Sequence, residues 1–164
     1  MSKTEKNLQD AFAGESQANR KYLAFAKKAE AEGHKQVAKL FRAAAAAETI
    51  HAHNHLRELG IVKSTRDNLL DAITGESYEF QNMYPGMIAD AQAEGNSMAL
   101  RSFNYANAVE KVHAALYQKA LDNLGRNKDT DYFVCSVCGY TAEGEAPDEC
   151  PVCGSKKQAF HKVE

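Results

Sequence analysis

The chain has 164 residues, enough for one substantial domain and a small appendix, and its 20 Lys and Arg residues nearly balance 22 Asp and Glu for a net charge of -2. This balance excludes the basic surface that would hold nucleic acid or an anionic membrane. Because the N-terminus has no signal-like apolar segment and the longest apolar run is five alanines (43–47), we expect a soluble cytoplasmic protein with no nucleic-acid or membrane partner.

Apolar side chains recur at helical spacing in four segments, and each segment is followed by a glycine that can end a helix. Ser64 or Thr65 can cap the third helix, and Asn96 or Ser97 can cap the fourth. Helices of about 25 to 30 residues, roughly 40 Å long, have the dimensions of a four-helix bundle. The predicted helices cover about residues 4–32, 35–59, 65–94 and 97–124. The fold class predicted for this part of the chain is therefore an all-α four-helix bundle.

The four helices contain an internal duplication. Glu48-x-x-His51 returns sixty-two positions later as Glu110-x-x-His113, and Gly14-Glu15-Ser16 returns at an offset of sixty-one as Gly75-Glu76-Ser77. Each copy therefore carries one Glu early and one Glu-x-x-His late.

A Glu and a His three positions apart lie on one face of a helix, so each pair can bind one ion. With Glu15 and Glu76, the two pairs supply four carboxylates and two imidazoles, which is the ligand set of di-iron or di-manganese sites in ferritin-like bundles. One alternative, solvated side chains, is disfavoured because these positions fall on the apolar stripes of the helices. The other, a salt-bridged core cluster, lacks positive charge.

The two copies differ by one carboxylate. Glu79 lies three positions after Glu76, whereas Ala18 holds the equivalent position after Glu15. An extra carboxylate allows a metal to exchange ligands as its charge changes, and we expect Glu79 and His51 to be the exchanging pair. Such a site suits the two-electron reduction of peroxide or oxygen.

The second copy also contains one inserted residue between Glu76 and Gly95. We expect a π-bulge near Tyr84-Pro85-Gly86 to absorb it. Tyr22 and Tyr84 occupy matching places in the two copies, where their hydroxyls could hydrogen-bond the ligand carboxylates, although core packing is an equally good reading of both.

Beyond the bundle the composition changes to Cys, Gly and Pro, which predicts a second domain. The expected organisation is a bundle over 1–126, a linker over 127–131 and a small domain over 132–164. The small domain has too few residues to fold without a metal. Its ligands would be four cysteines in two matching knuckles, which can hold one iron or one zinc: Cys135, Cys138, Cys150 and Cys153.

In the order and spacing of these motifs, nearly the whole chain resembles a rubrerythrin. The resemblance implies a ferritin-like bundle followed by a rubredoxin-like domain with short β-strands, and a non-haem di-iron peroxidase that reduces hydrogen peroxide to water. It also implies that electrons come from NAD(P)H through a reductase and often a rubredoxin, reach the four-cysteine iron and pass to the di-iron pair. The exchange of a Glu for a His in that family maps onto Glu79 and His51.

Two other functions are kept as alternatives. One is a ferritin-like iron-binding or ferroxidase protein whose cysteines hold a structural zinc. The other is a non-catalytic metal or redox sensor, which is disfavoured because the sequence has no additional partner-binding segment. Glu79 favours the peroxidase over simple iron storage.

The segment between the two copies predicts a domain-swapped homodimer. Two-fold related halves would require the connection after the second helix to climb roughly 30 Å along the bundle. Residues 60–66 reach only about 20 Å when extended. We therefore expect the first two helices of one chain to pack against the last two of another, so that each di-iron site takes ligands from both protomers.

Overall fold

The structure, a computed structural model, describes all 164 residues, and the contacts within it divide the chain into two compact units, Met1–Lys63 and Ser64–Glu164. Each unit contains one copy of the duplicated helical hairpin, and the second unit also contains the four cysteines. Mostly helical elements followed by a small β-sheet confirm the predicted fold class. The division into 1–126, 127–131 and 132–164, which followed composition, stays a prediction.

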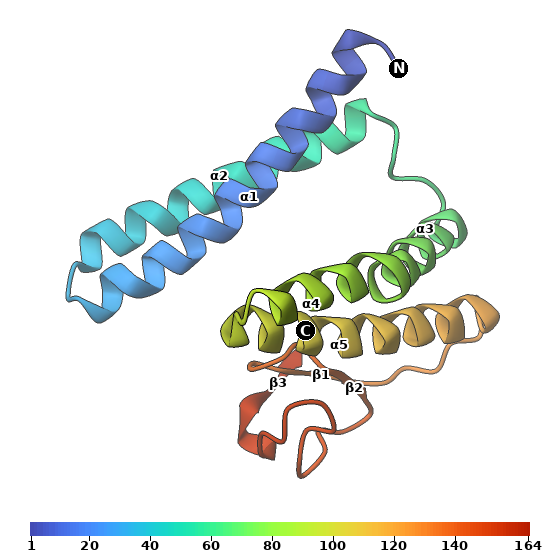
Figure 1. The fold of residues 1–164 in the computed structure, drawn as a ribbon. Helices are drawn as coiled ribbons and strands as arrows, with labels where there is room; N and C mark the ends of the chain where they lie inside the picture. Colours follow the sequence, from blue (N-terminus) through green and yellow to red (C-terminus); the bar gives the residue numbers. More distant parts are fainter. The chain divides into compact units, whose positions relative to one another are not determined.

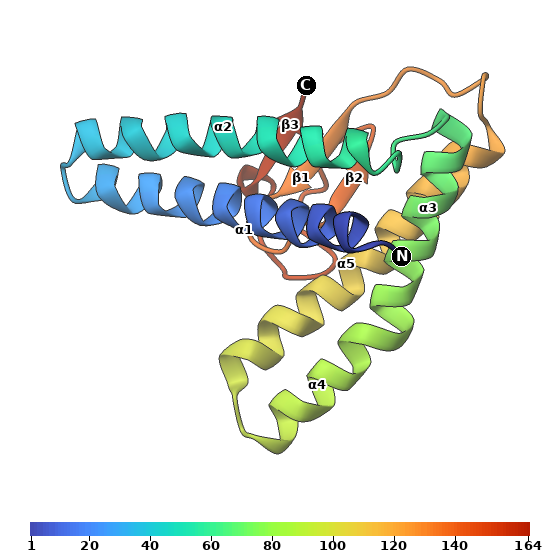
Figure 2. The same cartoon turned by 90° about the horizontal axis from the view of Figure 1, so that it is seen from above.

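In the first unit, α1 (Lys3–Ala31) and α2 (Lys35–Glu58) lie side by side as an antiparallel hairpin (Figures 1 and 2). The Ser2 side chain caps α1 together with Glu5. The buried side chains of both helices are small, which allows the two backbones to approach closely: Ala26, Ala29, Ala38, Ala45 and Ala52. Both helices end within two residues of their predicted ends.

In the second unit, α3 (Thr65–Tyr78), a π-helix η1 (Glu79–Met83) and α4 (Tyr84–Ala93) follow one another, and α5 (Ser97–Asp122) packs against them. The predicted caps are present: Ser64 Oγ accepts from the Asp67 N–H at 3.2 Å, and Asn96 Oδ1 accepts from the Ala99 N–H at 3.1 Å.

The π-helix confirms that the inserted residue is absorbed without breaking the helix, and it lies directly before the predicted Tyr84-Pro85-Gly86. Both of its flanking residues, Tyr78 and Tyr84, keep right-handed helical torsion angles. Pro85 then falls in the first turn of α4, where its missing N–H costs little.

The C-terminal part forms a three-stranded antiparallel sheet in the order β2-β1-β3. The strands are β1 (Tyr132–Cys135), β2 (Thr141–Glu143) and β3 (Phe160–Val163), and a short 3-10 helix η2 (Lys157–Ala159) precedes β3. Only small side chains are fully buried here, namely Cys135, Ala142, Ala146 and Cys150. So small a core agrees with the expectation that this domain depends on a metal to fold.

Large apolar side chains remain exposed on the helices of both units. Leu40, Ile50 and Met98 are 67%, 61% and 75% exposed, whereas Val109 is the only buried helical side chain larger than alanine. Exposed apolar side chains that gather on one face commonly mark a surface where another protein surface binds. No helix combines the length and apolarity that a membrane crossing demands.

Candidate metal centres

The first unit brings together three of the predicted ligands. Glu15 on α1 faces Glu48 and His51 on α2, and one ligand atom from each lies within 4.8 Å of the others. The His51 Nδ1 atom is 2.8 Å from Glu48 Oε2 and 3.9 Å from Glu15 Oε1. The i, i+3 spacing on α2 therefore produces the shared face that the sequence predicted.

The second unit repeats this geometry. His113 Nδ1 on α5 is 2.8 Å from Glu110 Oε2 and 3.8 Å from Glu76 Oε2, which α3 supplies. The two triads thus agree in their pairwise distances, and we call them the first and second half-sites. The duplication seen in the sequence is preserved in the geometry of the ligand atoms.

Crowding of carboxylates distinguishes the second half-site. Burial, a hydrogen bond to Glu110 and the charges of Glu110 and Glu79 together raise the pKa of Glu76 to about 7. Burial and the charge of Glu110 also raise the pKa of Glu79, against the opposing effect of His113. Glu79, on the π-helix, is therefore within electrostatic range of this cluster, although it lies outside the triad of Glu76, Glu110 and His113.

The two predicted tyrosines have different surroundings. The Tyr22 ring packs against Phe25 and Phe41, with ring centroids 6.3 and 6.1 Å away, in a small and partly exposed aromatic cluster. Burial and the charges of Glu110, Glu79 and Glu76 raise the pKa of the Tyr84 hydroxyl. The Tyr84 hydroxyl therefore lies within electrostatic range of the carboxylates of the second half-site.

Each half-site fits a metal ion. Ligand atoms bound at about 2.1 Å and at right angles lie about 3 Å apart, close to the 2.8 Å between Nδ1 and Oε2 in both half-sites. Two carboxylates and one imidazole suit iron or manganese. A cation there would also neutralise the carboxylates that raise one another's pKa in the second half-site.

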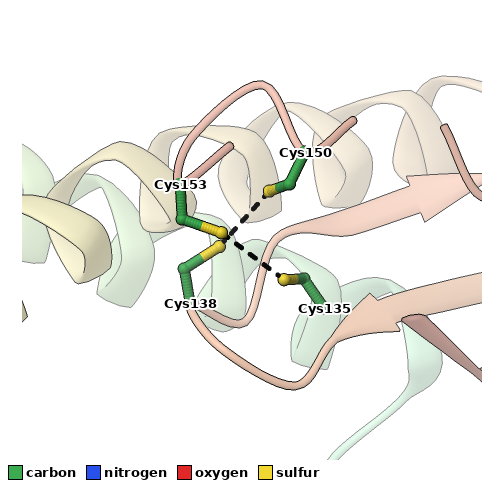
Figure 3. Close-up of side chains that lie close together, drawn as sticks. All are labelled: Cys135, Cys138, Cys150 and Cys153. Atoms are coloured by element: carbon green, nitrogen blue, oxygen red, sulfur yellow. Dashed lines mark hydrogen bonds between the residues drawn. The ribbon is translucent and has the colours of Figure 1, made fainter. Parts of the chain in front are cut away.

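The four cysteines point toward one another from two loops (Figure 3). The Sγ atoms of Cys135 and Cys153 are 3.7 Å apart and those of Cys138 and Cys150 are 3.5 Å apart. These distances are far longer than a disulfide and close to the edge of about 3.8 Å in a tetrahedron of sulfurs around one metal. The cluster therefore has the geometry of a four-thiolate metal site, whichever metal it holds.

The backbone of the two loops is built alike. The N–H of Gly139 donates to the Cys135 carbonyl at 2.8 Å, and the N–H of Gly154 donates to the Cys150 carbonyl at 2.9 Å. Both glycines have positive φ, 84° and 74°, which other residues rarely adopt. The two knuckles predicted from the sequence therefore have the same turn geometry.

The cysteine thiols differ in acidity. Burial raises the pKa of Cys138 and of Cys150. Burial also opposes ionisation of Cys153, but hydrogen bonds with Ser155 and with neighbouring cysteines outweigh it and lower its pKa to about 6. A metal ion stabilises all four as thiolates.

One contact at the second half-site has no signal in the sequence. The Nε2 atom of His113 is 3.0 Å from the hydroxyl of Thr141, which lies 28 residues further along the chain on β2. No motif or spacing rule connects a helix residue with a strand residue of another predicted domain.

Family comparisons cover both parts of the chain. A family model described as rubrerythrin matches residues 6–121, and one described as the rubredoxin-like domain of rubrerythrin matches residues 133–161. Nigerythrin of Nitratidesulfovibrio vulgaris is 40% identical over 96% of this chain and 85% of its own length. Rubrerythrin-2 of Clostridium acetobutylicum is 38% identical over 93% of this chain and 92% of its own length.

A solved structure of nigerythrin in its fully reduced, all-ferrous state superimposes with a TM-score of 0.61 at 37% identity, covering 99% of this chain and 88% of that one. Sequence, motif order and structure agree over nearly the whole length. The chain therefore belongs to the rubrerythrin family.

Proposed function

We propose that the chain is a non-haem di-iron peroxidase that defends against oxidative stress by reducing hydrogen peroxide. Each turnover combines one peroxide, two protons and two electrons and releases two water molecules. The electrons come from an NAD(P)H-dependent reductase or a rubredoxin and enter at an iron held by the four cysteines. Four free thiols arranged for a metal suit a reducing compartment such as the cytoplasm.

One observation carries this proposal: two half-sites of equal geometry, one of them with an additional carboxylate, on a chain that also carries a four-cysteine cluster. When bound, a pair of irons would supply two electrons together, as peroxide reduction requires. Glu15, Glu48 and His51 would hold one ion, and Glu76, Glu110 and His113 the other. Glu79 and His51 would exchange as ligands, while the Tyr84 hydroxyl would orient a ligand carboxylate.

The test is spectroscopic. Purified protein should contain about three irons per chain, one on the cysteines and two in the half-sites. Its visible absorption should bleach under an anaerobic reductant and return on stoichiometric peroxide. Protein that binds iron in the half-sites but stays reduced when peroxide is added contradicts the proposal.

A second function has specific support, because the sulfur geometry fits zinc as well as iron. With zinc on the cysteines the chain would be an iron-binding or ferroxidase protein without an electron relay. A colourless four-cysteine site with one zinc per chain, together with oxidation of added ferrous iron by oxygen, would favour this alternative.

We further propose that the active form is a domain-swapped dimer in which each metal pair joins the first half-site of one protomer to the second half-site of its partner. The exposed apolar faces of both hairpins and the short connection between them support it, since α2 ends at Glu58 and α3 begins at Thr65. A second copy of the same hairpins matches these faces in size and chemistry.

Mixing two inactive variants tests the swap. Glu48→Ala disables the first half-site and Glu110→Ala the second. In a swapped mixed dimer, one site combines both defects and the other has none, so random pairing restores about a quarter of all sites. Without swapping, every site keeps one defect, and no recovery after co-refolding would show that the dimer is not swapped.

A further inference from the structure

His113 uses both ring nitrogens. Its Nδ1 atom faces the carboxylates of Glu76 and Glu110, and its Nε2 atom lies 3.0 Å from Thr141 Oγ1. The Thr141 hydroxyl in turn donates to the carbonyl oxygen of Gly139 at 3.3 Å. Gly139 is covalently next to Cys138, one of the four clustered thiols.

The protons in this chain of contacts can be placed. A threonine hydroxyl has one proton, and here it points at the Gly139 carbonyl, which can only accept. Toward His113 the hydroxyl therefore accepts, so the imidazole carries its proton on Nε2. On the other side of the ring, Nδ1 lies 2.8 Å from Glu110 Oε2, a hydrogen-bond distance at which the two atoms share a proton in the metal-free chain. A metal ion that displaces this proton would bind the Nδ1 lone pair, while Nε2 keeps its own proton.

We propose that Thr141 is a positioning residue that attaches the four-cysteine domain to the second half-site of the same chain, by selecting the Nδ1-ligating form of His113 and fixing the plane of its ring. This inference rests on the metal site proposed above. It adds a continuous route of covalent bonds and two hydrogen bonds from Cys138 through Gly139 and Thr141 to His113.

Further contacts around the His113–Thr141 hydrogen bond join α5 to the four-cysteine domain. A Cβ atom placed on Gly139 would lie 3.9 Å from Val109 Cγ1, one turn before His113 on α5, and Val109 is only 2% exposed. Lys119 on α5 also forms a salt bridge with Glu143 on β2. Thr141 therefore lies between an apolar contact and an ion pair, both of which align β2 with the helix.

The first half-site offers a contrast. The Nε2 atom of His51 has no hydrogen-bond partner in its own chain, and the side chain is 53% exposed against 28% for His113. Because the cysteine domain follows only the second copy, only His113 receives a threonine partner. His113, held at both ring nitrogens, and His51, held only at Nδ1, agree with the proposal that His51 is the ligand that exchanges.

The proton position can be measured on the full chain loaded with Zn²⁺, a diamagnetic substitute for iron, by nitrogen-15 NMR of the six histidine rings. His113 is assigned by the loss of its signals in His113→Asn. We expect Zn²⁺ on Nδ1 and a slowly exchanging proton on Nε2. Ligation through Nε2, with the proton on Nδ1, would overturn the inference, and this measurement needs no Thr141 variant.

Variants of Thr141 test the positioning role. Thr141→Val keeps the shape and removes the hydroxyl, so Zn²⁺ affinity at His113 should fall about 10–100-fold, as for other groups that orient a metal ligand. Thr141→Ser should restore it. The matched control is Thr130→Val in the linker, a threonine whose side chain makes no hydrogen bond in the structure. The four-cysteine site should keep its Zn²⁺ in all three variants.

Unchanged Zn²⁺ affinity and unchanged proton position in a folded Thr141→Val protein would contradict the inference while leaving the metal site intact. In contrast, wild-type protein in which neither His51 nor His113 responds to Zn²⁺ would remove the metal site, and the inference with it. The two failures are therefore distinguishable in one set of spectra.

Discussion

Single residues distinguish two half-sites whose ligand geometry is otherwise the same. Glu79 adds a carboxylate near Glu76 and Glu110, where the first copy has Ala18. His113 has a hydrogen-bond partner at each ring nitrogen, Glu110 and Thr141, whereas His51 has one within its own chain only at Nδ1, where it contacts Glu48. The proposed chemistry depends on these differences, because an exchange of ligands requires one site that is fixed and one that can change.

Glu79→Ala gives the second copy an alanine at the position where the first copy has Ala18. We expect peroxide turnover to fall on the order of 100-fold, because the exchanging carboxylate is lost. Iron binding should persist, since Glu76, Glu110 and His113 remain. Stopped-flow oxidation of the reduced protein and iron analysis measure the two effects. Glu94→Ala, at an exposed glutamate of the same unit, is the control, and equal turnover in both variants would disprove the role of Glu79.

The raised pKa of Glu76 predicts how the stability of the metal-free protein depends on pH. Its pKa rises from 4.5 to about 7 on folding, so the folded state binds more protons between these values. The stability that Glu76 contributes is complete below pH 4.5 and is lost as the pH rises through 7. The melting temperature should therefore be lower at pH 8 than at pH 5, and added metal should reverse the loss.

Glu76→Gln is the matched control for this prediction, since the amide keeps the shape and does not titrate. Its melting temperature should change less with pH than that of the wild type. A metal-free wild type whose melting temperature is the same at pH 5 and pH 8, or is higher at pH 8, would show that Glu76 is not destabilised by its neighbours.

At the scale of elements, the π-helix keeps Tyr84 on the same side of its helix as Glu76, although the second copy has one more residue between them. Tyr84 lies eight residues after Glu76, whereas Tyr22 lies seven after Glu15. In a regular α-helix the eighth residue would be turned about 80° away. The wider turn over Glu79–Met83 absorbs that residue, and the carboxylates still influence the Tyr84 hydroxyl.

Backbone hydrogen exchange should reveal this segment. Hydrogen bonds of a π-turn have poorer geometry than those of an α-helix, so amides of residues 79–83 should exchange about tenfold faster than those in the adjacent turns of α3 and α4. The matching residues 18–22 of α1 are regular α-helix and provide the internal control. Equal protection in both segments would argue against a π-helix in solution.

At the scale of the whole molecule, the two compact units divide the predicted bundle between its two copies. Each unit contains a complete triad of ligands, but a di-iron site needs both triads. In the proposed dimer, the apolar side chains left exposed on α1, α2 and α5 would be covered by association of hairpins, and the short segment Leu59–Ser64 would determine which hairpins can associate.

Lengthening the segment Leu59–Ser64 should convert the proposed dimer into a monomer. Inserting about eight Gly and Ser residues after Val62 adds up to about 28 Å of reach, enough for the hairpins of one chain to meet. We expect a monomer that still binds iron, measured by light scattering at several concentrations. The same insertion after Lys128, in the predicted linker, should leave the dimer unchanged. If both insertions give the same oligomer, the short segment does not cause the swap.

Local patterns in the sequence were sufficient for much of this protein. The helices, their caps, the inserted residue and the two Glu-x-x-His pairs depend on residues within one or two turns of one another, so spacing alone predicts them. The cysteine knuckles are equally local, since each is built by four residues and a glycine. The order of these motifs was also sufficient to recognise the family.

Contacts between distant residues were decided only by the tertiary structure. The sequence placed Tyr22 and Tyr84 in equivalent positions, but only folding showed that Tyr22 packs among phenylalanines while Tyr84 is influenced by carboxylates. It likewise contained no sign that Thr141 would reach His113. Such contacts depend on how an appended domain packs against a helix, which no repeat or periodicity within either segment encodes.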